Sequence, residues 1–230
     1  MKRQVVMGLS GGMDSATLLG ILLHEGAEVH VCNFIYGSKH NEYEQAAAIS
    51  LVAHYMTLKQ PVTLHEFDLR DAFSRIKSNL LKSGGEIPEG HYEAESMKLT
   101  VVPGRNLIFA AVMAGLAESL GATSVALGVH SGDHAIYADC RPAFIQSLAQ
   151  TIKESSDYKV QVDTPLLFED KVSILRLGLA LPNPVPYEIT RTCYKDQKKS
   201  CGKCGSCIER LEAFAKLGIK DPIKYQKHKK

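Results

Sequence analysis

The sequence predicts an α/β protein built on a doubly wound parallel sheet. Short, β-branched apolar segments alternate with amphipathic segments of helical length along most of the chain. A glycine-rich turn joins the first of these strands to the first helix. Hydrophobic residues make up 45% of the 230 residues, which is enough to build a core. Strands of this kind are buried under helices on both faces of a sheet.

The alternation assigns each element in order. Strands are expected at residues 4–9, 28–34, 62–67, 124–128 and 159–163. Helices are expected at residues 15–24, 41–56, 107–120, 141–153 and 171–179. Gly26 and Gly121 stand where two of the helices should end. Because such sheets bind ligands at the carboxyl ends of their strands, the turn after the first strand is the expected site.

Two departures from the alternation predict the domain organisation. Residues 1–180 should form the α/β domain, with a glycine-rich, acidic, lid-like insertion at residues 78–97. With little apolar surface to bury, the insertion should be poorly ordered without ligand and close when one binds, Tyr92 being its only aromatic residue. Three prolines between residues 182 and 186 then open a C-terminal subdomain, residues 181–230, that contains a cysteine cluster.

Composition limits the function classes. The formal net charge of +2 is too small to indicate nucleic-acid binding by itself. No apolar run approaches the length of a membrane span. The N-terminus enters a strand without the apolar region of a signal peptide, so we expect a cytoplasmic protein. In that reducing compartment, six cysteines indicate metal ligands, catalytic thiols or core residues rather than disulfides.

The turn after the first strand has the features of a phosphate-binding loop. Gly11 and Gly12 let the backbone approach an anion closely, and the hydroxyls of Ser10 and Ser15 flank them. Asp14 would repel a phosphate unless it holds Mg²⁺ or orients the loop. No lysine follows the glycines, so this is not the G-x-x-x-x-G-K-[ST] loop. The predicted ATP-binding residues of the loop are Leu9, Ser10, Gly11, Gly12, Met13, Asp14 and Ser15.

Four cysteines near the C-terminus form the pattern C-x7-C-x2-C-x2-C, namely Cys193, Cys201, Cys204 and Cys207. Four thiolates at this spacing can close a tetrahedron around Zn²⁺ and leave no open position, which favours a structural zinc. An iron–sulfur cluster, which also takes four cysteines, is the main alternative. A disulfide pair is a more distant alternative.

Four separated segments resemble one family. The S-G-G-x-D-S loop is similar to the pyrophosphate loop of the PP-loop ATP pyrophosphatases. The other three segments are residues 102–106, residues 128–142, and Thr192-Cys193-Tyr194 with the C-x2-C-x2-C cysteines that follow. Together, the four segments resemble the 7-cyano-7-deazaguanine synthase family of the queuosine pathway. The resemblance runs nearly end to end. This chain has Ala138 where the family usually has proline, which removes a rigid turn but no functional group.

The resemblance implies a sheet of the adenine nucleotide α-hydrolase type and a ligase that turns 7-carboxy-7-deazaguanine and ammonia into a nitrile. ATP with Mg²⁺ would activate the carboxylate as an adenylate. The implied catalytic residues are Ser10, Asp14, Ser15 and Arg105, and Lys171 would join the ATP-binding residues. The implied substrate-binding residues are Arg105, Asn106, Asp133, Asp139 and Arg141.

Alternatives to these assignments stay open. Arg105 could form a surface ion pair, Asn106 could cap a helix, and Lys171 could be merely exposed. His40 could face the nucleotide, and Cys140 could face the substrate or serve the structure. The function itself could be tRNA thiolation by a PP-loop enzyme or nucleotide sensing without catalysis. It could also be a variant that stops at the amide or joins deazaguanine to another amine. The expected partners are small molecules, without a stable nucleic-acid complex or a membrane, and with a homodimer left open.

Overall fold

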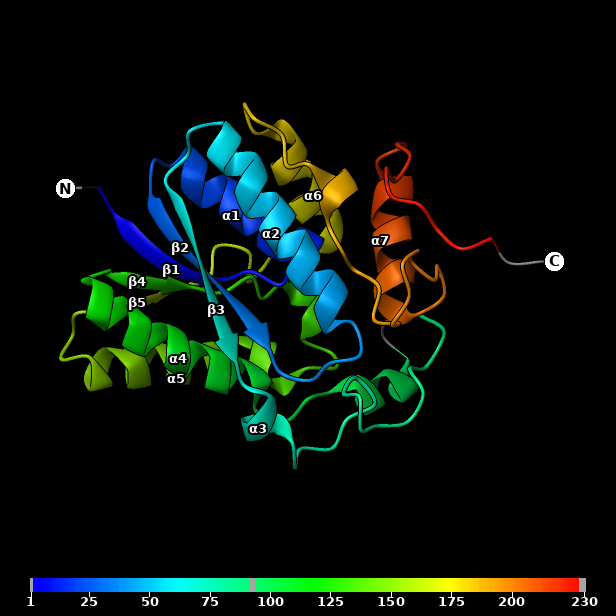
Figure 1. Ribbon diagram of the computed structural model, residues 1–230, viewed down its shortest axis with the longest axis horizontal. Coiled ribbons are helices and arrows are strands. Elements are labelled where there is room, and N and C mark those ends of the chain that lie inside the picture. The colour runs from blue at the N-terminus through cyan, green and yellow to red at the C-terminus, as the bar shows by residue number, and fades with distance from the viewer. Residues whose placement is uncertain (1, 92–93, 228–230) are drawn as a thin grey trace.

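The sheet has five parallel strands in the order β3-β2-β1-β4-β5 (Figure 1). The computed structural model describes residues 2–91 and 94–227. The strands are β1 (Gln4–Gly8), β2 (Glu28–Ile35), β3 (Val62–Asp68), β4 (Ser124–Ala126) and β5 (Gln161–Asp163). Strand order reverses between β1 and β4, where doubly wound sheets bind their ligands.

Helices cover both faces of the sheet, which confirms the predicted fold class. One face carries α1 (Met13–His24), α2 (Asn41–Thr57) and α6 (Lys171–Ala180), and the other carries α4 (Arg105–Leu120) and α5 (Pro142–Ser155) (Figure 1). The short α3 (Arg70–Phe73) follows β3, and α7 (Gly205–Lys216) stands beside the carboxyl ends of the strands. Within the described residues, none of the helices combines the length and the apolar character needed to cross a bilayer.

The central strand supplies both hydrophobic cores by simple alternation. Val5 and Met7 pack in the core that α1, α2 and α6 share. Val6 packs in the core under α4 and α5. All three side chains are fully buried, because β1 has a neighbouring strand on each side and helices above and below it. This burial holds the end of β1, and therefore the loop that follows it, in a fixed place.

Predicted boundaries differ from the observed ones where the chain turns toward the carboxyl edge of the sheet. Helix α1 begins at Met13 and α4 at Arg105, each two residues earlier than expected. Asn106 therefore lies inside α4, and Gly104, with a left-handed φ of 69°, occupies the cap position. The alternative assignment of Asn106 as a helix cap was wrong. Its backbone N–H is instead bound by the carboxylate of Asp139 at 3.1 Å.

One buried arginine ties separate parts of the C-terminal segment to one another. Arg210 of α7 is fully buried and makes a two-pronged ion pair with Asp221, at 2.8 Å from Nε and 2.9 Å from Nη2. The same guanidinium donates to Thr190 Oγ1 at 2.6 Å and to the carbonyl of Tyr187 at 3.0 Å. Separating a buried cation from its carboxylate partner costs free energy, because it leaves an unpaired charge away from water. These bonds therefore hold α7 against residues 187–190 and Asp221. The boundary predicted at residue 181 stays a prediction.

The insertion at residues 78–97 buries more apolar surface than its composition indicated. Leu80, Leu81, Ile87 and Met97 are buried in the core under α4, so the expectation of little apolar surface was wrong. The backbone of Gly90 also donates to the carbonyl of Lys203, at 3.0 Å, which ties the insertion to the cysteine segment. Tyr92 lies outside the described residues. Closure of the insertion on a ligand stays a prediction.

Candidate active site

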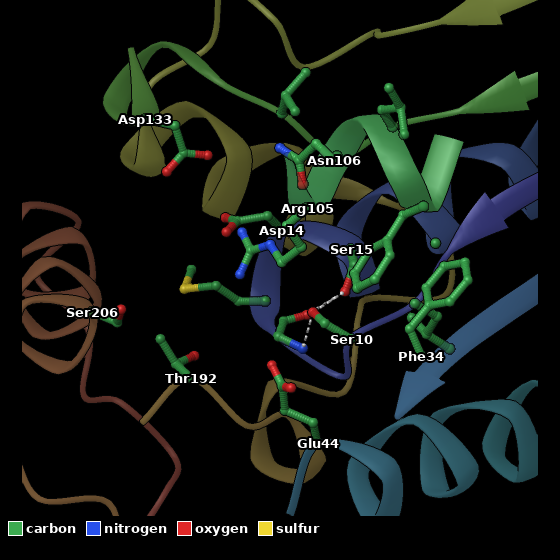
Figure 2. A pocket seen from close by; sticks show the side chains of 18 of the residues that line it. Ser10, Asp14, Ser15, Phe34, Glu44, Arg105, Asn106, Asp133, Thr192 and Ser206 are labelled. Carbon is green, nitrogen blue, oxygen red and sulfur yellow. Dashed lines mark hydrogen bonds between the residues drawn. The ribbon is translucent and has the colours of Figure 1, made fainter. Parts of the chain in front are cut away.

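A pocket opens at the carboxyl ends of β1, β2 and β4, where the strand order reverses (Figure 2). The pocket is lined by the loop after β1, the end of β2 and the start of α2, the start of α4, the segment after β4, the start of α6 and the cysteine-bearing C-terminal segment. The predicted site residues that line it are Leu9, Ser10, Gly12, Met13, Asp14, Ser15, Arg105, Asn106, Asp133 and Lys171. Most of the residues chosen from the sequence are thus brought together.

Hydrogen bonds of two serines stabilise the conformation of the loop after β1. Ser10 Oγ lies 3.1 Å from Ser15 Oγ and accepts from the backbone N–H of Gly12 at 3.2 Å (Figure 2). No side chain caps the N-terminus of α1 with a hydrogen bond. The first N–H groups of a helix have no partner within the helix and carry its positive dipole end. The loop therefore presents hydrogen-bond donors to an anion in the pocket.

Gly11 supports the loop from behind and is absent from the pocket lining. Its φ of 79° is left-handed, and a Cβ there would lie 2.7 Å from both the Cβ of Ala47 and the carbonyl oxygen of Glu44. Only glycine allows this close packing on α2. The Gly11 carbonyl accepts from the backbone N–H of Arg191 at 2.7 Å. The loop is thus pinned between α2 and the C-terminal segment.

Asp14 and Lys171 form the charged centre of the pocket. Lys171 Nζ lies 2.7 Å from Asp14 Oδ2, 3.0 Å from His130 Nε2 and 3.2 Å from Glu209 Oε2. His130 Nε2 in turn lies 3.4 Å from Asp133 Oδ2. The alternative in which Lys171 is merely exposed was wrong, because the residue is only 8% exposed. A lysine beside a phosphate-type loop supplies a point charge for an anionic ligand.

Electrostatics keep this pair ionised. Burial alone would raise the pKa of Asp14, but Lys171 and His130 outweigh it and hold that pKa below its usual value. Burial alone would lower the pKa of Lys171, but the carboxylates of Asp14 and Glu209 raise it instead. Burial also raises the pKa of Glu209, against the opposing effect of Lys171. An ammonium and a carboxylate therefore face each other next to the loop at neutral pH.

Arg105 is a half-buried cation among tyrosines. It lies against Tyr36, Tyr137 and Tyr194, and its pKa is raised: burial lowers it, but interactions with these side chains outweigh that effect. No ion pair found among residues 2–91 and 94–227 involves Arg105, so the alternative of a surface ion pair finds no partner there. Because its planar guanidinium donates in a fork, Arg105 could bind a carboxylate or a phosphate in the pocket.

Two predicted substrate residues lie outside the pocket lining. Asp139 is occupied with Asn106: its carboxylate accepts from the Asn106 backbone, and its carbonyl accepts from Asn106 Nδ2 at 3.2 Å. Arg141 is exposed and donates to the carbonyl of His134 at 2.9 Å. In this structure both side chains support the pocket from outside. Direct contact of either residue with the substrate stays a prediction.

An aromatic surface forms the apolar side of the pocket. The rings of Phe34 and Phe109 stack with centroids 4.0 Å apart and planes inclined by 12°. Cys32 and Met113 line the pocket beside them. Flat, apolar side chains of this kind suit a planar heterocycle, because stacked rings attract each other beyond the area that they bury. The pocket thus joins an apolar region to the charged loop.

One side of the pocket, formed by the C-terminal segment, was not predicted from the sequence. Figure 2 shows Thr192 and Ser206, from the C-terminal segment, facing the loop that carries Ser10 and Asp14. The lining residues not predicted as site residues include Phe34, Tyr36, Glu44, Phe109, Arg191, Thr192, Tyr194, Ser206 and Glu209. Thr192 and Tyr194 adjoin Cys193 in one of the family segments, and this adjacency was the available signal. His40 also lines the pocket, with Nε2 3.3 Å from Glu44 Oε1.

The four C-terminal cysteines come together as predicted. Their sulfur atoms all lie within 4.8 Å of one another and are buried. Four neighbouring thiolates therefore need a cation to compensate their charge, and the cluster could hold a metal ion.

Cys140 should not act as a nucleophile. Its sulfur is buried, and burial raises the pKa of the thiol well above its usual value, so the thiolate is scarce at neutral pH. We expect Cys140→Ser to keep turnover near that of the unchanged protein, whereas loss of a nucleophile lowers kcat by orders of magnitude. Steady-state kinetics of the purified variant measure this. A drop of several orders of magnitude in a folded variant would contradict it.

The parallel sheet, the glycine-rich loop at its switch point and the buried lysine beside that loop define a doubly wound α/β protein with a site for an anionic ligand. The chain belongs to the QueC family, because the family model described as queuosine biosynthesis protein QueC matches residues 4–218. A 7-cyano-7-deazaguanine synthase of Pseudoalteromonas atlantica is 43% identical over 98% of this chain and 100% of the relative. One of Hahella chejuensis is 44% identical over 94% of this chain and 90% of the relative.

Solved structures with a similar arrangement are more distant in sequence. The tRNA thiolase NcsA of Methanococcus maripaludis is 18% identical, with a TM-score of 0.48, over 81% of this chain and 61% of the thiolase. The NMN synthetase of Francisella tularensis is 13% identical, with a TM-score of 0.47, over 94% of this chain and 72% of the synthetase.

Proposed function

We propose that this chain is a 7-cyano-7-deazaguanine synthase, which uses ATP and ammonia to convert 7-carboxy-7-deazaguanine to the nitrile. Curated relatives that carry this name are 43% and 44% identical over nearly the whole chain. The observation that carries the proposal is the pocket itself. One side of the pocket carries a loop with hydrogen-bond donors, a lysine with a raised pKa, and an arginine that has no ion pair in the described chain. The other side is an aromatic surface.

The loop and Lys171 would bind the phosphates of ATP. The N–H groups at the start of α1 and the hydroxyls of Ser10 and Ser15 would donate to the departing pyrophosphate. Asp14 holds Lys171 beside the loop, at 2.7 Å. Interactions that strengthen as the leaving group gains charge raise kcat, because they act on the transition state. Mg²⁺, with Asp14 as the proposed protein ligand, would share the charge of the phosphates.

Arg105, Asn106 and Asp133 would orient the deazaguanine. Arg105 donates in a fork that fits a carboxylate, and its half-buried position strengthens the attraction. Asp133 lines the pocket. Its carboxylate would accept hydrogen bonds from the N–H groups of a guanine-type ring. Asp139 holds the backbone of Asn106, so it would act on the substrate through the start of α4. Arg141 would serve the same loop from outside.

The proposed chemistry balances in two adenylations. A carboxylate oxygen attacks the α-phosphorus of ATP and releases pyrophosphate. Ammonia then displaces AMP, loses a proton and leaves the amide. The amide oxygen attacks a second ATP, again releasing pyrophosphate. Loss of AMP from this adduct leaves the C≡N bond. The two N–H protons of the amide are removed in the course of these last two steps. The protein's part is to bind, orient and neutralise charge, which is the usual source of such catalysis.

The cysteine cluster is proposed to hold a structural zinc ion. Tetrahedral Zn–S bonds of about 2.3 Å place the sulfurs about 3.8 Å apart. The sulfurs of Cys201 and Cys207 lie 3.8 Å apart in this structure. Four protein ligands leave no open coordination position, so a zinc ion here would support the fold. We further propose a cytoplasmic protein that acts on small molecules without a stable nucleic-acid partner.

The nucleotide products test this function directly. With 7-carboxy-7-deazaguanine, ATP and ammonium, the protein should release AMP and pyrophosphate, two of each per nitrile formed. Chromatography of the nucleotides and mass spectrometry of the deazaguanine product measure both. ADP with inorganic phosphate would contradict the reading of the loop. AMP with an amide as the final product would instead indicate a variant that stops halfway.

A further inference from the structure

Glu209 is a carboxylate in the pocket that the proposed chemistry does not use. Its Oε2 lies 3.2 Å from Lys171 Nζ, and its side chain is only 15% exposed. Gly132 makes room for it, because a Cβ at that position would lie 2.9 Å from Glu209 Oε1. A carboxylate close to a phosphate site repels the phosphates, so it weakens ATP binding unless a nearby cation compensates its charge. In the described chain the one close cationic partner of Glu209 is Lys171, which indicates that Glu209 acts on this lysine.

The helix that carries Glu209 is fixed on both sides of it. Cys204 caps α7 and Cys207 lies in its first turn, so the cysteine cluster holds the start of the helix. The next residue after Glu209 is Arg210, whose guanidinium is fully buried and paired with Asp221. A helix anchored at these points cannot turn about its axis. The direction of the Glu209 side chain is therefore set before any ligand binds.

Lys171 needs such support, because its four-carbon stem rotates freely and must otherwise lose that freedom when ATP binds. An ammonium has three protons. Asp14, His130 and Glu209 surround it at 2.7, 3.0 and 3.2 Å. Asp14 lies in the first turn of α1 and His130 in the loop after β4, whereas Glu209 alone of the three reaches Lys171 from the cysteine-bearing helix α7.

We propose that Glu209 is a positioning residue that holds the Lys171 ammonium beside the phosphate loop, which makes helix α7 part of the ATP site. This inference rests on the proposed function, since it assumes that Lys171 contacts the phosphates of ATP. The cysteine cluster then has a second consequence besides stability. It fixes the start of the helix that aims a carboxylate into the pocket.

The first test compares two substitutions on the same helix. Glu209→Ala should lower kcat/KM for ATP about tenfold, a loss typical of residues that act through a shared partner. Glu212→Ala, three residues further along α7, is the matched control and should leave kcat/KM unchanged. Glu212 lies at the surface, where its carboxylate faces His91 at 3.6 Å. Metal content and melting temperature of Glu209→Ala should match the unchanged protein, which separates positioning from damage to the cluster.

A double-mutant cycle with Lys171→Gln decides how Glu209 acts. If Glu209 works through Lys171, adding Glu209→Ala to Lys171→Gln should change kcat/KM by no more than about twofold. An equal tenfold loss in both backgrounds would overturn the proposal, as would an unchanged or raised kcat/KM in Glu209→Ala alone. ATP consumption by the unchanged protein is measured in the same assay. Failure of that activity would count against the proposed function, and not against Glu209.

Discussion

Replacing Asp14 with Asn should lower kcat about 100-fold, the typical cost of removing one preorganised group from a charged transition state. The substitution leaves the shape of the loop but removes the charge that holds Lys171 at 2.7 Å. The ammonium would then turn toward Glu209, 3.2 Å away, and leave the phosphate loop. Release of pyrophosphate at saturating ATP and substrate measures the effect.

Two comparisons make this result specific. Asp71→Asn removes an exposed carboxylate from α3 and should leave kcat unchanged. Circular dichroism and a melting curve establish that Asp14→Asn is folded, since Asp14 also belongs to a partly shielded ion pair. Turnover equal to that of the unchanged protein in folded Asp14→Asn would remove Asp14 from the catalytic residues.

Replacing Cys201 with Ser should remove the metal and most of the soluble protein together. Structural zinc sites contribute about 10–16 kcal/mol to the folded state. Whole domains are stable by only about 5–15 kcal/mol. Loss of one ligand should therefore loosen the start of α7, which Cys204 and Cys207 otherwise fix. Metal analysis by mass spectrometry, soluble yield and melting temperature measure the change.

Cys140→Ser is the matched control, because Cys140 is also buried but lies outside the cluster. It should keep one metal ion per chain. The unchanged protein should contain zinc in this amount. Iron with sulfide would favour the alternative cluster, and a metal-free, fully stable protein would refute the metal site altogether.

The fold could be predicted because its signals are local. Apolar runs such as Val5 to Met7 indicate a buried strand wherever they occur, and the glycines at 11 and 12 mark the turn that follows. The spacing of the four cysteines likewise predicted a cluster that the structure brings within 4.8 Å. The loop was predicted from its own residues and the lysine and the arginine from the family resemblance, and all three line one pocket.

The sequence by itself thus determined the sheet, the phosphate-type loop and the cysteine cluster, since each depends on residues close together in the chain. Only the tertiary structure decided which side chains meet. Lys171 reaches Asp14 across 157 positions of sequence, and Glu209 approaches Lys171 from a third segment. The insertion at residues 78–97 buries apolar side chains that its average composition concealed. Such contacts depend on how separate elements pack, and no local pattern records that.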